Sequence, residues 1–284
     1  MTALSCYTAN LVEYLSYEDP EVRPRLAEAI RLAVRADEPG GALAFSHHAR
    51  IDGGTLGYRS AESWADTRAE LLAAGRALVV TDTAYVPWSP YPPDAHGPHW
   101  ILVLGGDGER WHVVDRFGAL TMHGRQRPHE GRLTDAELRR AMTPMPAAPA
   151  AVTNRDAHAL GERISLPPAA HYRWLARVSA EPLPAVEWLD GVPALRRIAS
   201  RLLASKTALA EHVDDLWAAA VHQQFRLGLV GEARPLVEAW TKLPRSLRFA
   251  VESARRGRPR PDLVTTAFDR VIAATEDLTA LSRR

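Results

Sequence analysis

Residue patterns typical of strands occur only in the first half of this sequence, and the second half is almost entirely of helical pattern. Before residue 120, β-branched and aromatic runs are separated by glycine- and proline-rich turns. After residue 155, apolar residues recur three and four positions apart, as at Leu209, Val213 and Leu216. Because strands and helices are segregated along the chain, we expect an α+β fold rather than a doubly wound parallel sheet.

Two helices are expected before any strand. Residues 6–17 place apolar side chains at helical spacing, and residues 21–34 predict a second helix with a proline in its first turns. Residues 38–60 contain glycine pairs and short apolar pieces, which indicate a hairpin or a long loop. Ser60 is then expected to cap a helix that ends near Ala74.

The following segment predicts an antiparallel sheet. Residues 76–88 form a β-branched run, and a proline-rich loop leads from it into a hairpin with strands at 100–104 and 110–114. A short helix is expected at 132–142, capped by Thr134 or Asp135.

Residues 143–154 contain three prolines and several small residues, which is typical of a boundary between domains. We therefore predict a catalytic domain over 1–145 and an α-helical bundle over 155–284. The helices of the bundle are expected at 169–180, 192–204, 206–230, 232–256 and 260–284. Four tryptophans are expected in its core: Trp174, Trp188, Trp217 and Trp240.

The composition limits the kinds of partner. The chain has 284 residues, of which 35 are Lys or Arg and 34 are Asp or Glu, so no general basic field favours nucleic acid. No segment reaches the roughly 18 apolar residues of a membrane span, and the N-terminus lacks a signal-peptide pattern. We expect a cytoplasmic protein with neither nucleic acid nor membrane as partner.

The chain has one cysteine, Cys6, which excludes an internal disulfide and a cysteine-rich zinc site. The histidines show no His-Glu-x-x-His spacing, and His47 and His48 are adjacent, so we expect no metal. The glycine-rich stretches lack the Lys-Ser/Thr of a phosphate loop, so no cofactor is expected. Cys6 is then either a buried structural side chain or a reactive one.

The predicted hairpin brings a histidine and an aspartate together. If pairing is symmetric about Asp107, His99 lies directly opposite Asp115, with Cβ atoms roughly 4.5 to 5.5 Å apart. A carboxylate in that place would hold the imidazole. Alternatively, both are polar residues at a solvated sheet edge.

Cys6 is expected at the start of the first helix, where unpaired N–H groups and the helix dipole favour a thiolate. A thiolate, an imidazole and a carboxylate have complementary roles: nucleophile, general base and orienting group. Cys6, His99 and Asp115 are therefore the candidate catalytic residues. His96 is the alternative base.

The N-terminal 120 residues resemble the butirosin biosynthesis protein H N-terminal family and, more distantly, the papain-like bacteriocin-processing cysteine peptidases. The matching pieces are "CYTANLVEYL" from Cys6, "GGTLGYR", "ALVVTDTAYVPW", "HGPHWILVLG" and "WHVVDRFG". The resemblance implies a papain-like fold that performs acyl transfer in natural-product biosynthesis, such as that of an antibiotic. The acyl group would come from a thioester on the phosphopantetheine of an acyl carrier protein, and a small-molecule amine would accept it.

The sequence departs from the peptidase pattern at the oxyanion hole. Papain-like peptidases place a glutamine shortly before the cysteine, and "MTALS" contains none. The N–H of Cys6 would be one donor, and Asn10, His47, His48 or a backbone group would be the second.

Two other functions stay open: a cysteine peptidase or thioester hydrolase with the same three residues, and a binding protein in which Cys6 is structural. Several further side chains are candidates for the cleft, each with a structural role as the alternative: Asp52, Tyr58, Arg59, Trp88, Tyr91, His222 and Gln223. Four arginines are a candidate docking patch for an acidic carrier protein: Arg255, Arg256, Arg258 and Arg260.

Overall fold

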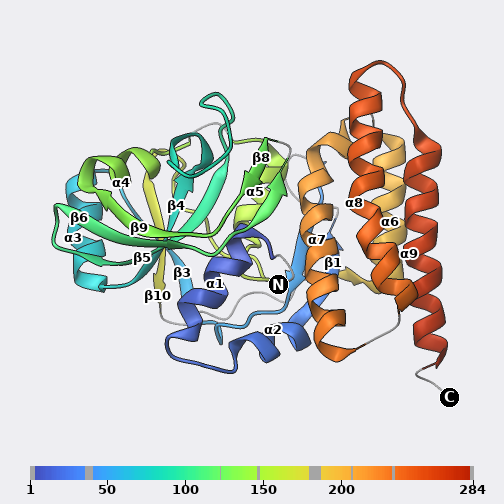
Figure 1. The fold of residues 1–284 in the computed structure, drawn as a ribbon, viewed down its shortest axis with the longest axis horizontal. Helices are drawn as coiled ribbons and strands as arrows, with labels where there is room; N and C mark the ends of the chain where they lie inside the picture. Colours follow the sequence, from blue (N-terminus) through green and yellow to red (C-terminus); the bar gives the residue numbers. More distant parts are fainter. Residues whose placement is uncertain are drawn as a thin grey trace. The chain divides into compact units, whose positions relative to one another are not determined.

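The computed structural model describes residues 4–35, 41–121, 123–145, 148–178, 187–205, 207–231 and 234–281. It is a mixed α+β structure in which all paired strands of the described residues are antiparallel (Figure 1). The α+β prediction is confirmed. None of the helices in these ranges combines the length and the apolar character needed to cross a membrane.

The chain divides into two compact units, each formed by segments that are not contiguous in the sequence. The sheet unit takes in Ala3–Arg25 and Arg50–Leu183, and the helical unit takes in Leu26–Ala49 and Pro184–Arg284. The crossing between Arg25 and Leu26 lies within helix α2 (Val22–Ala29).

The sheet unit is built on a sheet with the strand order β3-β10-β4-β5-β6-β9 among the described residues. Its strands are β3 (Leu56–Ala61), β4 (Ala77–Asp82), β5 (Pro98–Gly106), β6 (Arg110–Asp115), β9 (His129–Thr134) and β10 (Tyr172–Arg177). A separate pair consists of β7 (Ala119–Thr121) and β8 (Gly124–Gln126). The helices are α1 (Cys6–Ser16), α3 (Trp64–Ala74), the 3₁₀ turn η2 (Thr83–Tyr85), α4 (Asp135–Ala141) and α5 (Ala150–Ala157).

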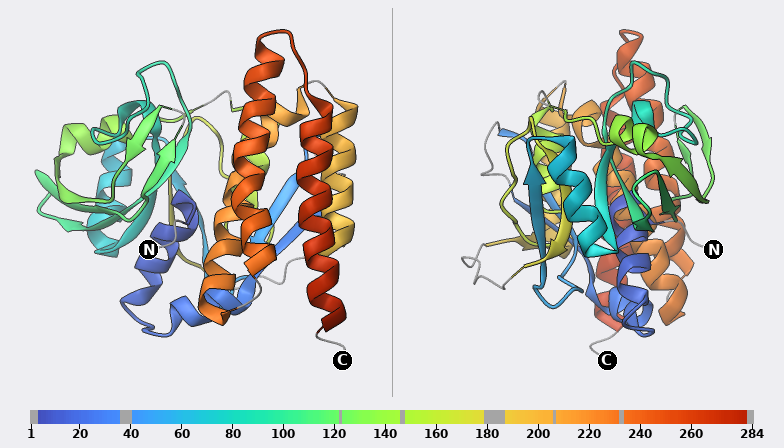
Figure 2. Two further views of the ribbon diagram at one scale, coloured as in Figure 1. Left: turned by 45° about the vertical axis from the view of Figure 1, so that its right-hand side comes forward. Right: turned by 90° about the vertical axis from the view of Figure 1, so that its left-hand side faces the viewer.

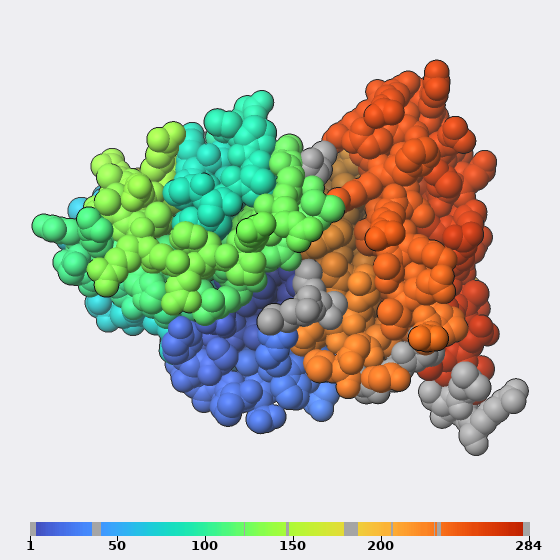
Figure 3. All heavy atoms as spheres, viewed as in Figure 1, coloured from blue at the N-terminus to red at the C-terminus, as the bar shows by residue number. Residues whose placement is uncertain are grey.

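Helices cover both faces of this sheet. Ile101 of β5 packs in one apolar cluster with Leu71 of α3 and Leu138 of α4. Trp100 points to the opposite face, because side chains alternate along a strand, and there it contacts Tyr7 of α1. Figure 3 shows the segment from β6 to β9, in green, beside the blue atoms of α1. Helix α1 is thus held with its N-terminus near the start of β5, where the site lies.

The helical unit combines a small sheet with a bundle. The sheet has the order β11-β1-β2, and α8 and α9 lie side by side in the bundle (Figures 1 and 2). The strands are β1 (Ile30–Arg35), β2 (Ala44–His48) and β11 (Leu189–Asp190), and the helices are α6 (Gly191–Ala204), α7 (Ala208–Val230), α8 (Arg234–Arg255) and α9 (Pro261–Leu281). Apolar side chains of β1 and β2, such as Val34 and Phe45, share one core with the bundle.

The unit boundary differs from the predicted one at residues 145–155. The proline-rich segment leads into α5 and β10, and both belong to the sheet unit. Residues 169–180 were expected to be the first bundle helix, but 172–177 are strand β10, paired with β3 and β4. Its Trp174 is accordingly buried in the sheet core rather than in the bundle. Local helical spacing did not reveal that two strands flank this segment.

Other local predictions also change. Residues 30–34 were expected to belong to the second helix, but 30–35 form β1, because β2 and β11 pair with this segment on either side. Ser63 rather than Ser60 caps α3, with its Oγ accepting from the N–H of Asp66 at 3.1 Å. The helix expected at 6–17 is confirmed as α1. The helix expected at 132–142 is confirmed from Asp135 as α4 with Thr134 as its cap, and residues 132–134 belong to β9.

Candidate active site

Cys6 is the first residue of α1 and is partly exposed. Ser5 caps the helix, because its Oγ accepts from the N–H of Thr8 at 3.3 Å and its carbonyl oxygen accepts from the N–H of Ala9 at 2.8 Å. The remaining N–H groups of a first turn have no partner within the helix and favour negative charge beside them. The predicted position of Cys6 at a helix start is confirmed.

His99 and Asp115 are bonded in the buried end of the β5–β6 hairpin. The distance from His99 Nε2 to Asp115 Oδ2 is 2.8 Å, and their side chains are only 4% and 0% exposed. The side chain of Cys6 lies near enough to His99 to raise the pKa of its imidazole. Because Nε2 contacts Asp115, Nδ1 is the ring nitrogen that remains for the thiol. The structure thus brings the three predicted side chains into one series, in which His99 is bonded to Asp115 and lies beside Cys6.

The predicted register of the hairpin is wrong by two residues. Leu102 pairs with Val114 and Val103 with Val113, and the pairing shifts again before Gly106. This register sets Asp115 opposite Ile101, so that His99 and Asp115 are diagonal neighbours on one face rather than direct partners. A shift of two residues preserves the face, since side chains alternate with a period of two.

Five hydrogen bonds fix the carboxylate of Asp115. Its Oδ2 accepts from His99, from Trp88 Nε1 at 2.8 Å and from Gln126 Nε2 at 3.0 Å. Its Oδ1 accepts from Asn10 Nδ2 at 3.0 Å and from the N–H of Phe117 at 2.9 Å. These donors bond the ionised form, so the carboxylate is held as an anion in a fixed orientation.

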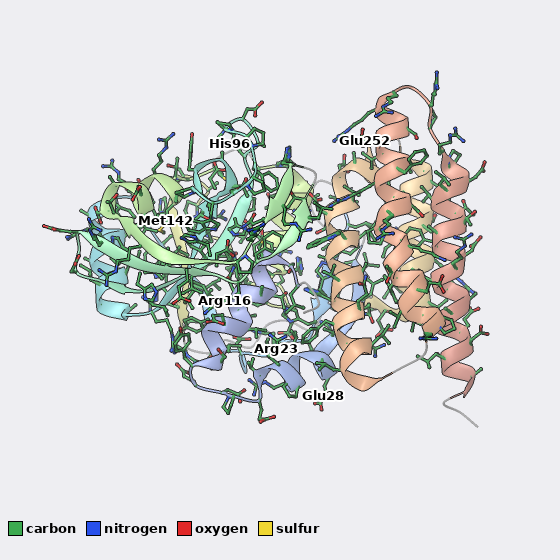
Figure 4. All side chains as sticks on the ribbon, in the orientation of Figure 1. Arg23, Glu28, His96, Arg116, Met142 and Glu252 are labelled. Atoms are coloured by element: carbon green, nitrogen blue, oxygen red, sulfur yellow. The ribbon has the colours of Figure 1, made fainter. Side chains whose placement is uncertain are left out.

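Asn10 connects the start of α1 with both strands of the hairpin. Its Nδ2 donates to the carbonyl oxygens of Cys6 at 3.1 Å and Trp100 at 2.6 Å as well as to Asp115. Its Oδ1 accepts from the N–H of Arg116 at 2.8 Å. The Arg116 side chain, labelled in Figure 4, reaches back to Glu13 of α1 at 2.8 Å. Asn10 is fully buried, and these bonds set the position of Cys6 relative to Asp115.

The electrostatics of the site favour an imidazolium. Burial lowers the pKa of His99, but the charges of Asp115 and Cys6 and hydrogen bonds to both raise it, and the net effect raises the pKa to about 10. Burial raises the pKa of Asp115, but the charge of His99 and hydrogen bonds from His99, Trp88 and Asn10 outweigh it and lower the pKa. At neutral pH the site therefore holds a protonated His99 beside an ionised Asp115.

His96, the alternative base, lies outside this series. Its Nδ1 is 2.6 Å from Asp82 Oδ2, and its ring contacts Tyr85. Figure 4 shows His96 at the outer end of the loop that precedes β5. The same loop carries Trp88, which stacks on His129 at 4.0 Å between ring centroids, and Tyr91, which contacts His123. Of these loop residues, Trp88 belongs to the site, because its Nε1 donates to Asp115.

The candidates from the "IDGGTLGYR" stretch have different positions. Asp52 closes a turn, accepting from Arg50 and from the N–H of Leu56 at 2.8 Å. Tyr58 lies on β3, with its ring 6.3 Å from that of Trp100. Arg59 is on the same strand and exposed. Asp52 is thus structural, and Tyr58 is next to the site.

Other candidates belong to the helical unit. His222 is buried, and its ring lies 5.4 Å from that of His47 and 6.3 Å from that of His48. Gln223 is buried, and Trp188 lies beneath Arg31 and Arg35. Trp240 is in the bundle core, as predicted, and Trp217 is partly buried. No group of three potential metal ligands occurs in the described parts of the chain.

The four arginines of the predicted docking patch are exposed around the loop between α8 and α9. Arg255 and Arg256 contact Glu252 at 3.3 and 3.8 Å near the end of α8, and Glu252 is labelled in Figure 4. The role of these arginines in docking a carrier protein stays a prediction.

Sequence reasoning did not find Asn10 as an orienting residue, nor Gln126. The spacing of Asn10, four residues after Cys6 on one helix face, was a usable signal. Gln126 had none, because β8 reaches Asp115 only in the folded chain. Comparison with known proteins finds no family model that matches the sequence and no curated protein with significant similarity to it.

Proposed function

We propose that this protein is a cysteine-dependent acyltransferase in which Cys6 is the nucleophile, His99 the acid–base group and Asp115 the orienting carboxylate. The observation that carries the proposal is the 2.8 Å bond between His99 and Asp115 beside Cys6, the first residue of α1. A helix start, a protonated imidazole and a fixed carboxylate together favour a thiolate at neutral pH.

Acylation begins from the thiolate and the imidazolium. Cys6 Sγ attacks the carbonyl carbon of a thioester, the bond from that carbon to the donor's sulfur breaks, and the departing thiolate takes the proton of His99. The products are an acyl-Cys6, a free donor thiol and a neutral imidazole. Deacylation reverses the proton flow, since an amine attacks the acyl carbon and gives its proton to His99 while Cys6 leaves as the thiolate.

The charge of Cys6 is one reason why His99 is protonated at rest. Coulombic attraction to Cys6 and a hydrogen bond to it both raise the pKa of His99. Acylation removes that charge, so the pKa of His99 falls in the acyl-enzyme and the neutral imidazole becomes the resident form. His99 is then a base when the amine arrives.

The donor and acceptor follow from the family resemblance. We infer a papain-like fold for the sheet unit, an acyl group delivered on the phosphopantetheine of an acyl carrier protein, and a small-molecule amine as acceptor in natural-product biosynthesis in the cytoplasm. Buried Asp115 and His99 support this choice, because a site that excludes water from its base gives an amine an advantage over hydrolysis.

The oxyanion would bind at the start of α1. The N–H of Cys6 is the first donor. Asn10 is unsuited as the second, because its Nδ2 already donates to three acceptors. We therefore infer a backbone N–H of the same helix turn as the second donor.

The test is the intact mass of the protein after incubation with a panel of acyl-thioester surrogates, with Cys6→Ser and Cys6→Ala as controls. An adduct that requires Cys6 and is discharged faster by amines than by water supports the transferase. Discharge by water alone indicates a hydrolase or peptidase. No adduct, together with a thiol inert to alkylating agents, indicates a binding protein with a structural Cys6.

A further inference from the structure

The residues that follow Cys6 and His99 are in direct contact. The rings of Tyr7 and Trp100 meet edge to face, with centroids 4.7 Å apart and planes at 78°. Both side chains are buried, at 5% and 0% exposure. Tyr7 follows Cys6 and Trp100 follows His99 in the chain, so the contact between the two rings helps to set the distance between Cys6 and His99.

The hydroxyl of Tyr7 is fixed by a residue far along the chain. It donates to Asp156 Oδ1 at 2.5 Å, and Asp156 lies near the end of α5. Burial, followed by the charge of Asp156, holds the pKa of Tyr7 well above its usual 10. The hydroxyl therefore stays protonated and is the donor in this bond.

The other carboxylate oxygen of Asp156 forms an ion pair with an arginine. Arg173 of β10 reaches Oδ2 at 3.2 Å, and both side chains are nearly buried, at 11% and 3% exposure. Burial raises the pKa of Asp156, and the charge of Arg173 and the hydrogen bond from Tyr7 oppose that rise. The Tyr7 acceptor is thus itself held in place from the sheet.

Trp100 has a second aromatic neighbour, Tyr58, which is also hydrogen-bonded to Asp156. The ring of Tyr58 meets it at 6.3 Å, and the Tyr58 hydroxyl donates to the carbonyl oxygen of Asp156 at 3.4 Å. Trp100 therefore contacts two tyrosines that are both bonded to Asp156. Tyr7, Trp100 and Asp156 are buried and Tyr58 is partly exposed, and none of them has a step in the proposed reaction.

We propose that Tyr7, bonded to Asp156 and packed against Trp100, is a positioning residue that fixes Cys6 at the correct distance from His99. The proposal rests on the proposed function for its catalytic meaning. Tyr7 is the second residue of α1, so a rotation of the first turn would move Cys6 and Tyr7 together. Displacement of a reacting group by about 1 Å can reduce a rate by about 10²-fold.

The experiment follows the alkylation of Cys6 in the full chain by iodoacetamide as a function of pH, using intact mass. Cys6 is the chain's single cysteine, so each adduct reports on that thiol. The variants are Tyr7→Phe, Asp156→Ala and Asp156→Asn, the last of which retains an acceptor for the tyrosine hydroxyl. The matched control is Tyr14→Phe, the same change on the same helix, in a buried ring that lies beneath Arg76.

In the wild type, the thiolate paired with His99 should react at neutral and mildly acidic pH. Tyr7→Phe and Asp156→Ala should move the half-maximal rate to higher pH and lower the kcat of acyl transfer by at least about tenfold with little change in KM. Asp156→Asn should lie closer to the wild type than Asp156→Ala. Tyr14→Phe should leave both profiles unchanged.

Unchanged alkylation profiles and kcat in the Tyr7 and Asp156 variants, with a lower Tm alone, would overturn the proposal and leave the triad intact. A wild-type Cys6 that alkylates like an ordinary free thiol would instead contradict the proposed function, whatever Tyr7 does. If Tyr7→Phe does not fold, the comparison of Asp156→Asn with Asp156→Ala decides, because only the asparagine preserves the acceptor.

Discussion

His99 Nε2 lies 2.8 Å from Asp115 Oδ2, although the two residues are not cross-strand partners. The hairpin register displaces them diagonally, and the five donors around Asp115 hold its carboxylate at this angle. The bond therefore depends on Trp88, Gln126 and Asn10 as well as on the hairpin, and the effect of each donor can be measured.

Asp115→Asn should reduce turnover by about 10²- to 10⁴-fold, the range for loss of effective acid–base catalysis. The amide can accept through one atom only, and its NH₂ would face donors such as Trp88 and Gln126. The neutral side chain also removes the main charge that raises the pKa of His99. Single-turnover acylation and the pH profile of Cys6 alkylation measure both effects. A variant that acylates at the wild-type rate would exclude Asp115 from the mechanism.

Trp88→Phe should lower kcat by about tenfold, because it removes one charged hydrogen bond of about 1.5 to 3 kcal/mol while keeping an aromatic ring on His129. The control is Trp64→Phe, which removes an equivalent indole bond of 2.8 Å to Asp135, away from the site. Both variants should lose stability in urea denaturation, and only Trp88→Phe should lose activity. Equal activities in the two variants would show that the Trp88 bond is structural.

Asn10→Ala should lower the free energy of unfolding by at least about 1 to 3 kcal/mol, the cost of one buried polar group without a partner. The change removes the Asn10 hydrogen bonds to the Trp100 carbonyl and the Arg116 N–H and one of the two hydrogen bonds to Asp115 Oδ1. Asn10→Asp keeps the acceptor but sets a second carboxyl group beside Asp115, so it should be worse at neutral pH than at acidic pH. Denaturation curves of both variants at two pH values test this ordering, and a neutral effect of Asn10→Ala would refute it.

His222 should make the protein less stable in mild acid. Burial, followed by the charges of His47 and His48, holds the pKa of His222 well below its usual 6.5. The unfolded chain therefore binds a proton at this residue below about pH 6.5 while the folded chain does not, so stability falls as the pH decreases from there. His222→Gln should flatten this decline between pH 7.5 and about 5.5 in urea denaturation. Parallel curves for the variant and the wild type would contradict the assignment.

His99 has the opposite pH dependence. Because its pKa is raised to about 10, its contribution to stability is complete below the unfolded value and is lost as the pH rises toward 10. Cys6→Ala removes one of the charges that raise this pKa, so the alkaline loss of stability should begin at lower pH. The free energy of unfolding from pH 7 to 10 measures the shift, and an unchanged alkaline profile would show that Cys6 carries no charge beside His99.

Much of the site could be predicted because its signals are local. The helix that starts at Cys6 was predicted from apolar spacing, and the β5–β6 hairpin was predicted from two β-rich runs around a glycine-rich turn. The bond between His99 and Asp115 was predicted correctly although the predicted register was wrong by two residues, because an even shift keeps both side chains on the same face of the sheet.

The remaining features depend on partners distant in sequence. Residues 30–35 and 172–177 are strands because flanking strands supply their hydrogen bonds, and neither segment shows this in its own spacing. Asp156 reaches Tyr7 only because α5 packs within the sheet unit, across a segment whose prolines indicated a boundary. The sequence alone determined which three side chains were candidates for the site, since helix starts and tight hairpins are encoded by neighbouring residues. The tertiary structure decided which side chains orient that site, because a buried hydrogen-bond network is assembled from elements that meet only after the chain has folded.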